Sequence, residues 1–343
     1  MDDISLKLAA LKLVEQGKIS FDTPLADYLP ELRQLVIVEP DSETTVARPA
    51  ETPLTLTHLL NFSSGLFYSG LRRKSPNALA FGYTDKEVHT LEDPISGFLQ
   101  IIIVNLPGVP LKFEPGTDFV YGWSSDILGF IVEKVSQKSL EDFCKEHIFG
   151  PLGMSSSFYL RPDLKKDLVN LTYTSAGDGK LYPWADQMEI MEQSPDKLHL
   201  HLGGVGMYSS TRDYLKLLRH MLQIHAGHDT TVAPIWKLET IRQIFVPALT
   251  EKGSKSISDM VAQPGTQWGT AMAIATVDKP KGKKKGSAFW GGYAGTYHFI
   301  DPTTGIVVMF GMQLTPPRGP DLLDLYPKLE ELIYAAVEVT DNA

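Results

Sequence analysis

The chain has 343 residues and a mass of 38.0 kDa, enough to bury a large core in one large domain or two. Hydrophobic residues make up 43% and charged residues 21%, which is typical of a globular protein. The net charge of -9 disfavours nucleic acid as the main partner, because phosphate binding requires clustered Lys and Arg. The single cysteine, Cys144, excludes an internal disulfide, and its amphipathic surroundings predict a buried structural thiol.

Neither a membrane span nor a signal peptide is visible. The longest apolar stretch, residues 95–111, is interrupted by Asn105, Pro107 and Pro110. The opening MDDISLK has no basic region followed by an apolar one. For a chain that starts at Met1, these features predict by default a cytoplasmic protein with no membrane partner.

The first half of the chain predicts helices joined by turns. Ile4, Leu8, Leu11 and Val14 recur at helical spacing, and Gly17 follows as a C-terminal cap. Further helices are expected over residues 54–60, with Thr55 or Thr57 as N-cap, and over 124–135 and 140–149. Residues 160–200 are polar and irregular, and we expect them to cross one face of the protein.

The last third predicts an antiparallel sheet. A capping box at residues 210–213 opens a helix over 214–224. Residues 267–277 and 287–313 are rich in β-branched and aromatic residues and are divided by turns. Residues 279–286, KPKGKKKG, form the expected hairpin tip, whose lysines would keep an exposed edge soluble. An amphipathic helix over 322–337 would cover the sheet.

Tyr121 is the first candidate site residue. It follows the turn at Pro115 and Gly116 and precedes a helix that starts near Ser124. The positive end of that helix favours a phenolate, which with a cationic neighbour could exchange a proton with a serine. The alternative is a packing tyrosine. The chain has 13 tyrosines, so position alone favours the alternative.

The second candidate is the strand segment Trp290-Gly291-Gly292 with Tyr293. Glycines inside a strand often mark a place where a ligand approaches the backbone. An acyl substrate could lie along this ledge, and the Tyr293 amide could donate to a developing oxyanion. A bulge or twist of the sheet explains the two glycines equally well.

Other enzyme motifs are absent from the sequence. It contains no HExxH, no G-x-S-x-G elbow and no Walker motif, and Gly203 to Gly206 lacks the strand and helix of a dinucleotide site. These absences disfavour a zinc hydrolase, an α/β-hydrolase and a P-loop enzyme.

Several segments in order resemble the serine β-lactamase-related family of class C β-lactamases, family VIII esterases and fungal polyketide acyltransferases. They are LKLVEQGKISFDTPLADYLPEL, LTLTHLLNFSSGL, FEPGTDFVYGWSSDILG and WGGYAGTYHFIDP. The resemblance covers nearly the whole chain. It implies an α/β (α+β) fold of one domain, 1–343, in which an antiparallel sheet is flanked by helices and an all-helical region is inserted, so that residues from about 18 to 225 would be mostly helical. It implies no metal and no organic cofactor. An antiparallel sheet and C-terminal helix would follow over 266–340.

The resemblance also implies roles for individual residues. Tyr121 matches the tyrosine that shuttles the proton, and Trp290-Gly291-Gly292 matches the strand that carries Lys-Thr-Gly in β-lactamases. Tyr293 then supplies the backbone oxyanion donor. Trp123, a secondary candidate, stands where β-lactamases usually have Asn. The tryptophans at 123 and 290 remove polar partners, so the implied substrate is a small-molecule acyl ester with an apolar portion.

The family's Ser-x-x-Lys is the main departure. Counting back along the first helix puts its lysine at about Asp3 and its serine just before Met1. Ser5 and Lys7 are too close in sequence to take both roles, and Ser194 to Lys197 lies in a polar stretch with a proline. The sequence thus predicts a chain truncated before the nucleophile and the family's N-terminal strands, and inactive as written. The alternative is a degenerate, non-catalytic relative that binds a ligand or partner.

Overall fold

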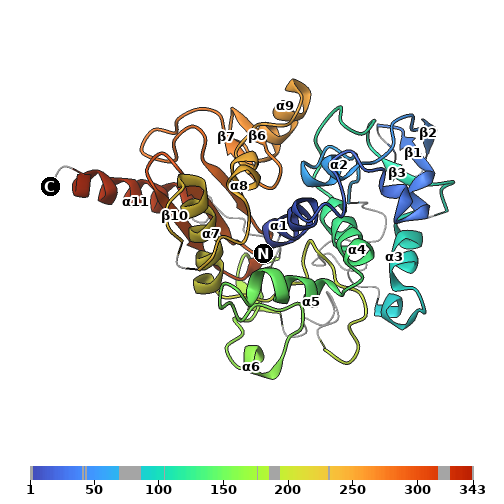
Figure 1. Ribbon diagram of the computed structural model, residues 1–343, viewed down its shortest axis with the longest axis horizontal. Coiled ribbons are helices and arrows are strands. Elements are labelled where there is room, and N and C mark those ends of the chain that lie inside the picture. The colour runs from blue at the N-terminus through green and yellow to red at the C-terminus, as the bar shows by residue number, and fades with distance from the viewer. Residues whose placement is uncertain are drawn as a thin grey trace.

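A five-stranded antiparallel sheet dominates the second half of the chain in the computed structural model (Figure 1). The structure describes residues 3–40, 42, 45–68, 86–103, 105–175, 177–184, 194–230, 232–315 and 325–341. The strands are β6 (Thr266–Trp268), β7 (Ala273–Ala275), β8 (Ala288–Gly291), β9 (Tyr297–Asp301) and β10 (Ile306–Phe310). Each pairs with the next along the chain, so the predicted meander is confirmed.

Helices cover both faces of this sheet. Tyr334 of α11 (Leu325–Asp341) stacks on Phe299, with ring centroids 6.1 Å apart. Tyr214 of α7 (Thr211–Ala226) lies 5.1 Å from the ring of His298. Phe299 and His298 are successive residues of β9, so their side chains point to opposite faces. The α/β architecture implied by the resemblance is therefore present.

The first helix, α1 (Asp3–Glu15), is the central element of the molecule (Figure 1). Residues 4–11 are all buried, and the helix packs against α4 (Ser124–Ser136) and α5 (Leu140–Cys144). A helix that is apolar all round is typical of a protein core. Ser5 and Lys7 are the polar residues of this buried stretch, and both are fully buried.

The region on the other side of α1 is helical but not all-helical, in contrast to what the resemblance implies. Its helices are α2 (Leu56–Leu60) and α3 (Pro94–Ile103), with shorter turns η1 (Leu25–Asp27), η2 (Pro30–Arg33), η4 (Lys86–Thr90) and η5 (Lys145–Phe149). It also holds a small sheet of β2 (Val46–Pro49), β1 (Leu35–Val38) and β3 (Val109–Leu111). The apolar stretch 35–38 is buried there as the central strand.

The polar stretch after residue 160 has more structure than its sequence predicts. After α6 (Pro162–Lys165), β4 (Thr172–Thr174) and β5 (Leu181–Pro183) form a hairpin that pairs with β11 (Leu314–Thr315). Leu171 and Trp184 form a small core that Ala294 contacts. This hairpin therefore lies beside the turn that follows β8.

Two remaining helices, α8 (Leu238–Ile244) and α9 (Glu251–Met260), precede the sheet. Cys144 is buried as predicted, and Thr55 is the N-cap of α2. The prediction of solvated lysines on the 279–286 hairpin is wrong for Lys283, which is 1% exposed because Glu330 of α11 pairs with it. In the described parts of the chain, no helix is both long and apolar enough to cross a bilayer.

Candidate active site

Tyr121 is held at the start of α4 by a segment that runs alongside residues 62–63. The N–H of Gly116 donates to the carbonyl of Ser63 at 2.8 Å, and the N–H of Val120 donates to that of Phe62 at 3.1 Å. Gly116 has a φ of +88°, a conformation that favours glycine. The predicted turn, extended piece and helix start are therefore present, and they fix Tyr121 beside Phe62.

Two carboxylates anchor the approach to Tyr121. Glu114 accepts from the N–H groups of Glu51 and Thr52 and pairs with Arg48. Burial acts to raise the pKa of Glu114, but the Arg48 pair and these donors hold it below its usual value. Asp118 accepts from Ser256 at 2.7 Å and pairs with Lys252 at 3.0 Å, which ties α9 to the same segment.

Four rings form an aromatic cluster, which we define as Phe62, Tyr121, Trp268 and Trp290. The ring of Tyr121 lies 4.8 Å from that of Phe62 and 5.4 Å from that of Trp290. Trp268 lies 4.9 Å from Phe62 and 4.6 Å from Trp290. The two candidate segments of the sequence, about 170 residues apart, thus meet in one cluster between α4 and the sheet.

Trp123 takes a different position from the other candidates. It is 3% exposed, and its ring lies 4.7 Å from Tyr68 and 5.3 Å from Phe98. Tyr68 in turn lies 5.9 Å from Tyr121. Trp123 therefore belongs to the core of the helical region and is linked to the cluster through Tyr68.

The glycine segment ends β8 in a tight turn. Gly291 pairs with Tyr297 across β9, and the N–H of Gly292 donates to the carbonyl of Thr296 at 2.8 Å. A Cβ atom on Gly292 would lie 2.2 Å from Oγ1 of Thr296, so the turn alone accounts for this glycine.

Beyond this turn the backbone is open on one side. β7 pairs with β8 only at Ala288 and Phe289, so its ladder stops short of Gly291. Tyr293 is 52% exposed, and within the described residues its N–H donates to no acceptor. The segment can therefore offer an amide donor at the edge of the aromatic cluster.

Lys7 is a site residue that the sequence reasoning missed. Its Nζ lies 3.7 Å from the ring centroid of Phe62 and 4.2 Å from that of Trp268. These distances are those of cation–π contacts. The sequence signal was present, since Lys7 is a lysine within the run 4–11, which is apolar apart from Lys7 and Ser5.

The serines near the cluster are buried. Ser5 is fully buried, and within the described residues its hydroxyl has no hydrogen-bond partner. The hydroxyls of Ser64 and Ser124 bond to each other at 2.7 Å, and both residues are fully buried. Ser194 lies in a turn in which Lys197 is exposed, so the S-x-x-K at 194–197 does not open a helix.

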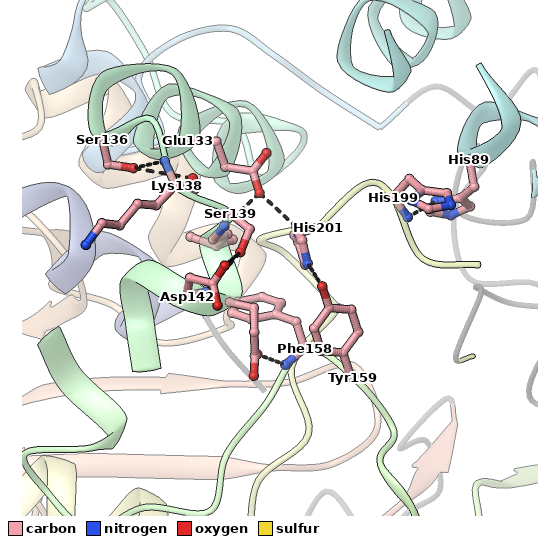
Figure 2. Close-up of polar contacts among 12 residues, drawn as sticks. His89, Glu133, Ser136, Lys138, Ser139, Asp142, Phe158, Tyr159, His199 and His201 are labelled. Atoms are coloured by element: carbon pink, nitrogen blue, oxygen red, sulfur yellow. Dashed lines mark hydrogen bonds and ion pairs between the residues drawn. The ribbon is translucent and has the colours of Figure 1, made fainter. Parts of the chain in front are cut away.

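A buried polar network fixes the far end of α4 (Figure 2). Nδ1 of His201 lies 2.8 Å from Oε1 of Glu133, and its Nε2 lies 3.1 Å from the hydroxyl of Tyr159. Burial and the nearby carboxylates of Glu141, Asp142 and Glu133 raise the pKa of Tyr159, so its phenol stays protonated. The N–H of Gly204 donates to Asp126 at 3.0 Å, which fixes the loop to α4 a second time.

The chain matches the family model described as Beta-lactamase over residues 7–331. It is 26% identical over 351 residues to ML-236A carboxylate methylbutanoyltransferase of Penicillium citrinum, covering 96% of this chain and 78% of that protein. It is also 26% identical over 351 residues to lovastatin esterase of Penicillium rubens, covering 95% of this chain and 82% of the relative.

Solved structures show the same architecture. Unliganded simvastatin synthase from Aspergillus terreus superposes with a TM-score of 0.73 at 25% identity, covering 97% of this chain and 81% of that one. EstCE1, a hydrolase with promiscuous acyltransferase activity, superposes with a TM-score of 0.66 at 20% identity, covering 92% and 79%. At this level of identity, the similarity to EstCE1 concerns the fold alone.

Proposed function

Because the chain belongs to the Beta-lactamase family, we propose that its site serves acyl transfer from an ester through a serine, to water or to an alcohol. One observation carries the proposal: the ring of Tyr121 lies 5.4 Å from that of Trp290, which joins the two candidate segments. The names of the relatives, a methylbutanoyltransferase and an esterase, agree with this reaction class. We further propose that residues 1–343 form one domain, since α1 shares its core with both halves of the chain.

In this proposal each candidate has one role. Tyr121 accepts the proton of the nucleophilic hydroxyl and returns it to the leaving group. The N–H of Tyr293 donates to the oxyanion, a contribution typically worth about 3–4 kcal/mol of transition-state stabilisation. Trp290, Gly291 and Gly292 form the ledge along which the acyl chain lies. The support is that Tyr293 is exposed three residues after Trp290 of the cluster, and that its N–H donates to no acceptor within the described residues.

The substrate class follows from the surroundings of Tyr121. Trp290 is partly exposed and presents an apolar ring, which packs on the buried ring of Trp268, and Trp268 packs in turn on the buried ring of Phe62. Trp290 stands where β-lactamases have the lysine of Lys-Thr-Gly, so the carboxylate of a penicillin would lack that partner. A small ester with an apolar acyl group therefore fits the site better than a β-lactam.

We also propose that residues 1–343 alone bind such an ester without forming the acyl-serine. Ser5, Ser64 and Ser124 are fully buried, and Asp3 stands where the family's lysine is expected. The same observation favours a second candidate function, a non-catalytic relative that only binds its ligand.

Completing the family's Ser-x-x-Lys tests the proposal. A leader ending in serine is placed before Met1 and combined with Asp3→Lys, and hydrolysis of p-nitrophenyl butyrate is measured with and without Tyr121→Phe. We expect no turnover by residues 1–343, turnover by the completed protein, and its loss with Tyr121→Phe. The completed protein should be labelled by a fluorophosphonate probe at the added serine.

Three results would contradict the proposal. Saturable, Tyr121-dependent hydrolysis of the ester by residues 1–343 alone would locate a nucleophile inside the chain. A folded completed protein that neither hydrolyses the ester nor takes up the probe would favour the non-catalytic candidate. Efficient turnover of nitrocefin would overturn the assignment of apolar esters.

A further inference from the structure

Lys7 lies one helical turn after Asp3 on the same face of α1. Residues i and i+4 of a helix stack on one face, and side chains lean toward the N-terminus. A lysine side chain is about as long as the 5.4 Å pitch of the helix, so the amine of residue 7 reaches back about one turn. The ammonium of Lys7 can therefore lie near the Cα position of residue 3 along the helix axis, where the side chain of the family's lysine begins.

The contacts of Lys7 match a cation that is held in place. It is fully buried, and the rings of Phe62 and Trp268 lie 3.7 and 4.2 Å from its Nζ. Aromatic faces attract a positive charge, which offsets part of the cost of burying an ammonium. The indole N–H of Trp268 donates to the carbonyl of Leu60 at 3.1 Å, which fixes that ring.

Phe62 has an unusual backbone conformation for its size. Its φ is +57°, a region that a bulky side chain rarely adopts. Its carbonyl accepts from Val120, one residue before Tyr121, at 3.1 Å. Such an outlier points to a functional constraint. Here the strained backbone brings one ring into contact with both partners, 3.7 Å from the ammonium of Lys7 and 4.8 Å from the phenol ring of Tyr121.

We propose that Lys7 is the positioning cation of this site, stabilising Tyr121 as a phenolate from one turn further along α1 than the family's lysine. The inference rests on the proposed function for its role in catalysis. Lys7 makes no bond to substrate and takes no proton; it acts only through Tyr121. The ring of Phe62 holds the ammonium in place, so the strained backbone of Phe62 contributes to the positioning of Lys7.

Nitration by tetranitromethane tests this inference without any nucleophile, because the reagent attacks phenolates. Tyr121 and Tyr159 are both half-buried, and Tyr159 is the internal control because burial and carboxylates raise its pKa. Peptide mapping at neutral pH gives the nitration rate of each in the wild-type protein and in Lys7→Met, Lys7→Arg and Lys12→Met. Lys12, on the same helix, bonds instead to Glu15 and the carbonyl of Ile235.

We expect Tyr121 to be nitrated at least about tenfold faster than Tyr159 in the wild-type protein, as one nearby opposite charge predicts. Lys7→Met should slow the nitration of Tyr121 about tenfold and leave that of Tyr159 unchanged, whereas Lys7→Arg and Lys12→Met should keep the wild-type rates. Equal rates for the two tyrosines in the wild-type protein overturn the inference even if Lys7→Met fails to fold. An unchanged Tyr121 rate in folded Lys7→Met overturns it too. Neither result depends on ester turnover, so the inference and the proposed function can fail separately.

Discussion

Replacing Glu330 with glutamine tests the buried ion pair that holds the β7–β8 hairpin against α11. The side chains of Lys283 and Glu330 are each 2% exposed, and Nζ of Lys283 lies 3.4 Å from Oε2 of Glu330. Lys283 also donates to the hydroxyl of Tyr297 at 2.8 Å, and Lys279 donates to Glu330 at 2.8 Å. Glutamine keeps the volume of Glu330 but leaves a buried ammonium without its countercharge.

The expected cost is large. Removing one partner of a buried ion pair lowers the free energy of unfolding by about 3–5 kcal/mol. The partly exposed Lys279 adds at most about 1 kcal/mol to this. We therefore expect a loss of about 3–5 kcal/mol for Glu330→Gln at pH 7, measured by urea denaturation. Combining it with Lys283→Met should recover most of the loss, because no unpaired charge then remains buried.

The same pair predicts a pH dependence. Burial lowers the pKa of Lys283 to about 8 from 10.5, although Glu330 acts in the opposite direction. The unfolded state therefore holds more protons between these values, and Lys283 makes stability rise with pH through that window. The gain between pH 7 and 9 is about 1 kcal/mol. Above pH 10 Tyr297 opposes it, since burial raises the pKa of that phenol.

Two outcomes would refute this reasoning. The first is a loss below about 1 kcal/mol for Glu330→Gln at pH 7, the value of a surface pair. The second is a Lys283→Met variant that keeps the wild-type change in stability between pH 7 and 9.

Two further predictions concern buried histidines. Burial lowers the pKa of His298 to about 3 from 6.5, so the unfolded chain binds a proton that the folded one excludes. The free energy of unfolding should fall below pH 6.5 by up to about 1.4 kcal/mol per pH unit. Between pH 7 and 5, thermal melts should show a smaller loss of stability for His298→Phe than for the wild-type protein. Equal losses would contradict this prediction. His201→Ala should cost about 2–3 kcal/mol by leaving Glu133 and Tyr159 without their shared partner, and Tyr159→Phe about 1 kcal/mol. Chemical denaturation measures both losses, and a larger loss for Tyr159→Phe than for His201→Ala would contradict the prediction.

The sequence by itself determined the features that depend on local pattern. The turn before Tyr121, the start of α4 and the order of strands β6 to β10 are set by glycine and proline turns and by hydrophobic period. The ordered segments around Tyr121 and Trp290 were also enough to indicate the family. These patterns lie within a few residues of the elements that they predict, so the prediction requires no knowledge of long-range contacts.

Only the tertiary structure decided which charged side chains are buried. Lys283 carries the same group as the exposed Lys285 two residues away, and nothing local separates them. The apolar neighbours of Lys7 predict that it is buried but not which residues enclose its ammonium. Lys7 is buried because Phe62 and Trp268, distant in sequence, enclose its ammonium. Burying a charge is unfavourable unless partners compensate for the lost water. Those partners come from distant parts of the chain, so the local sequence does not predict them and only the tertiary structure shows them.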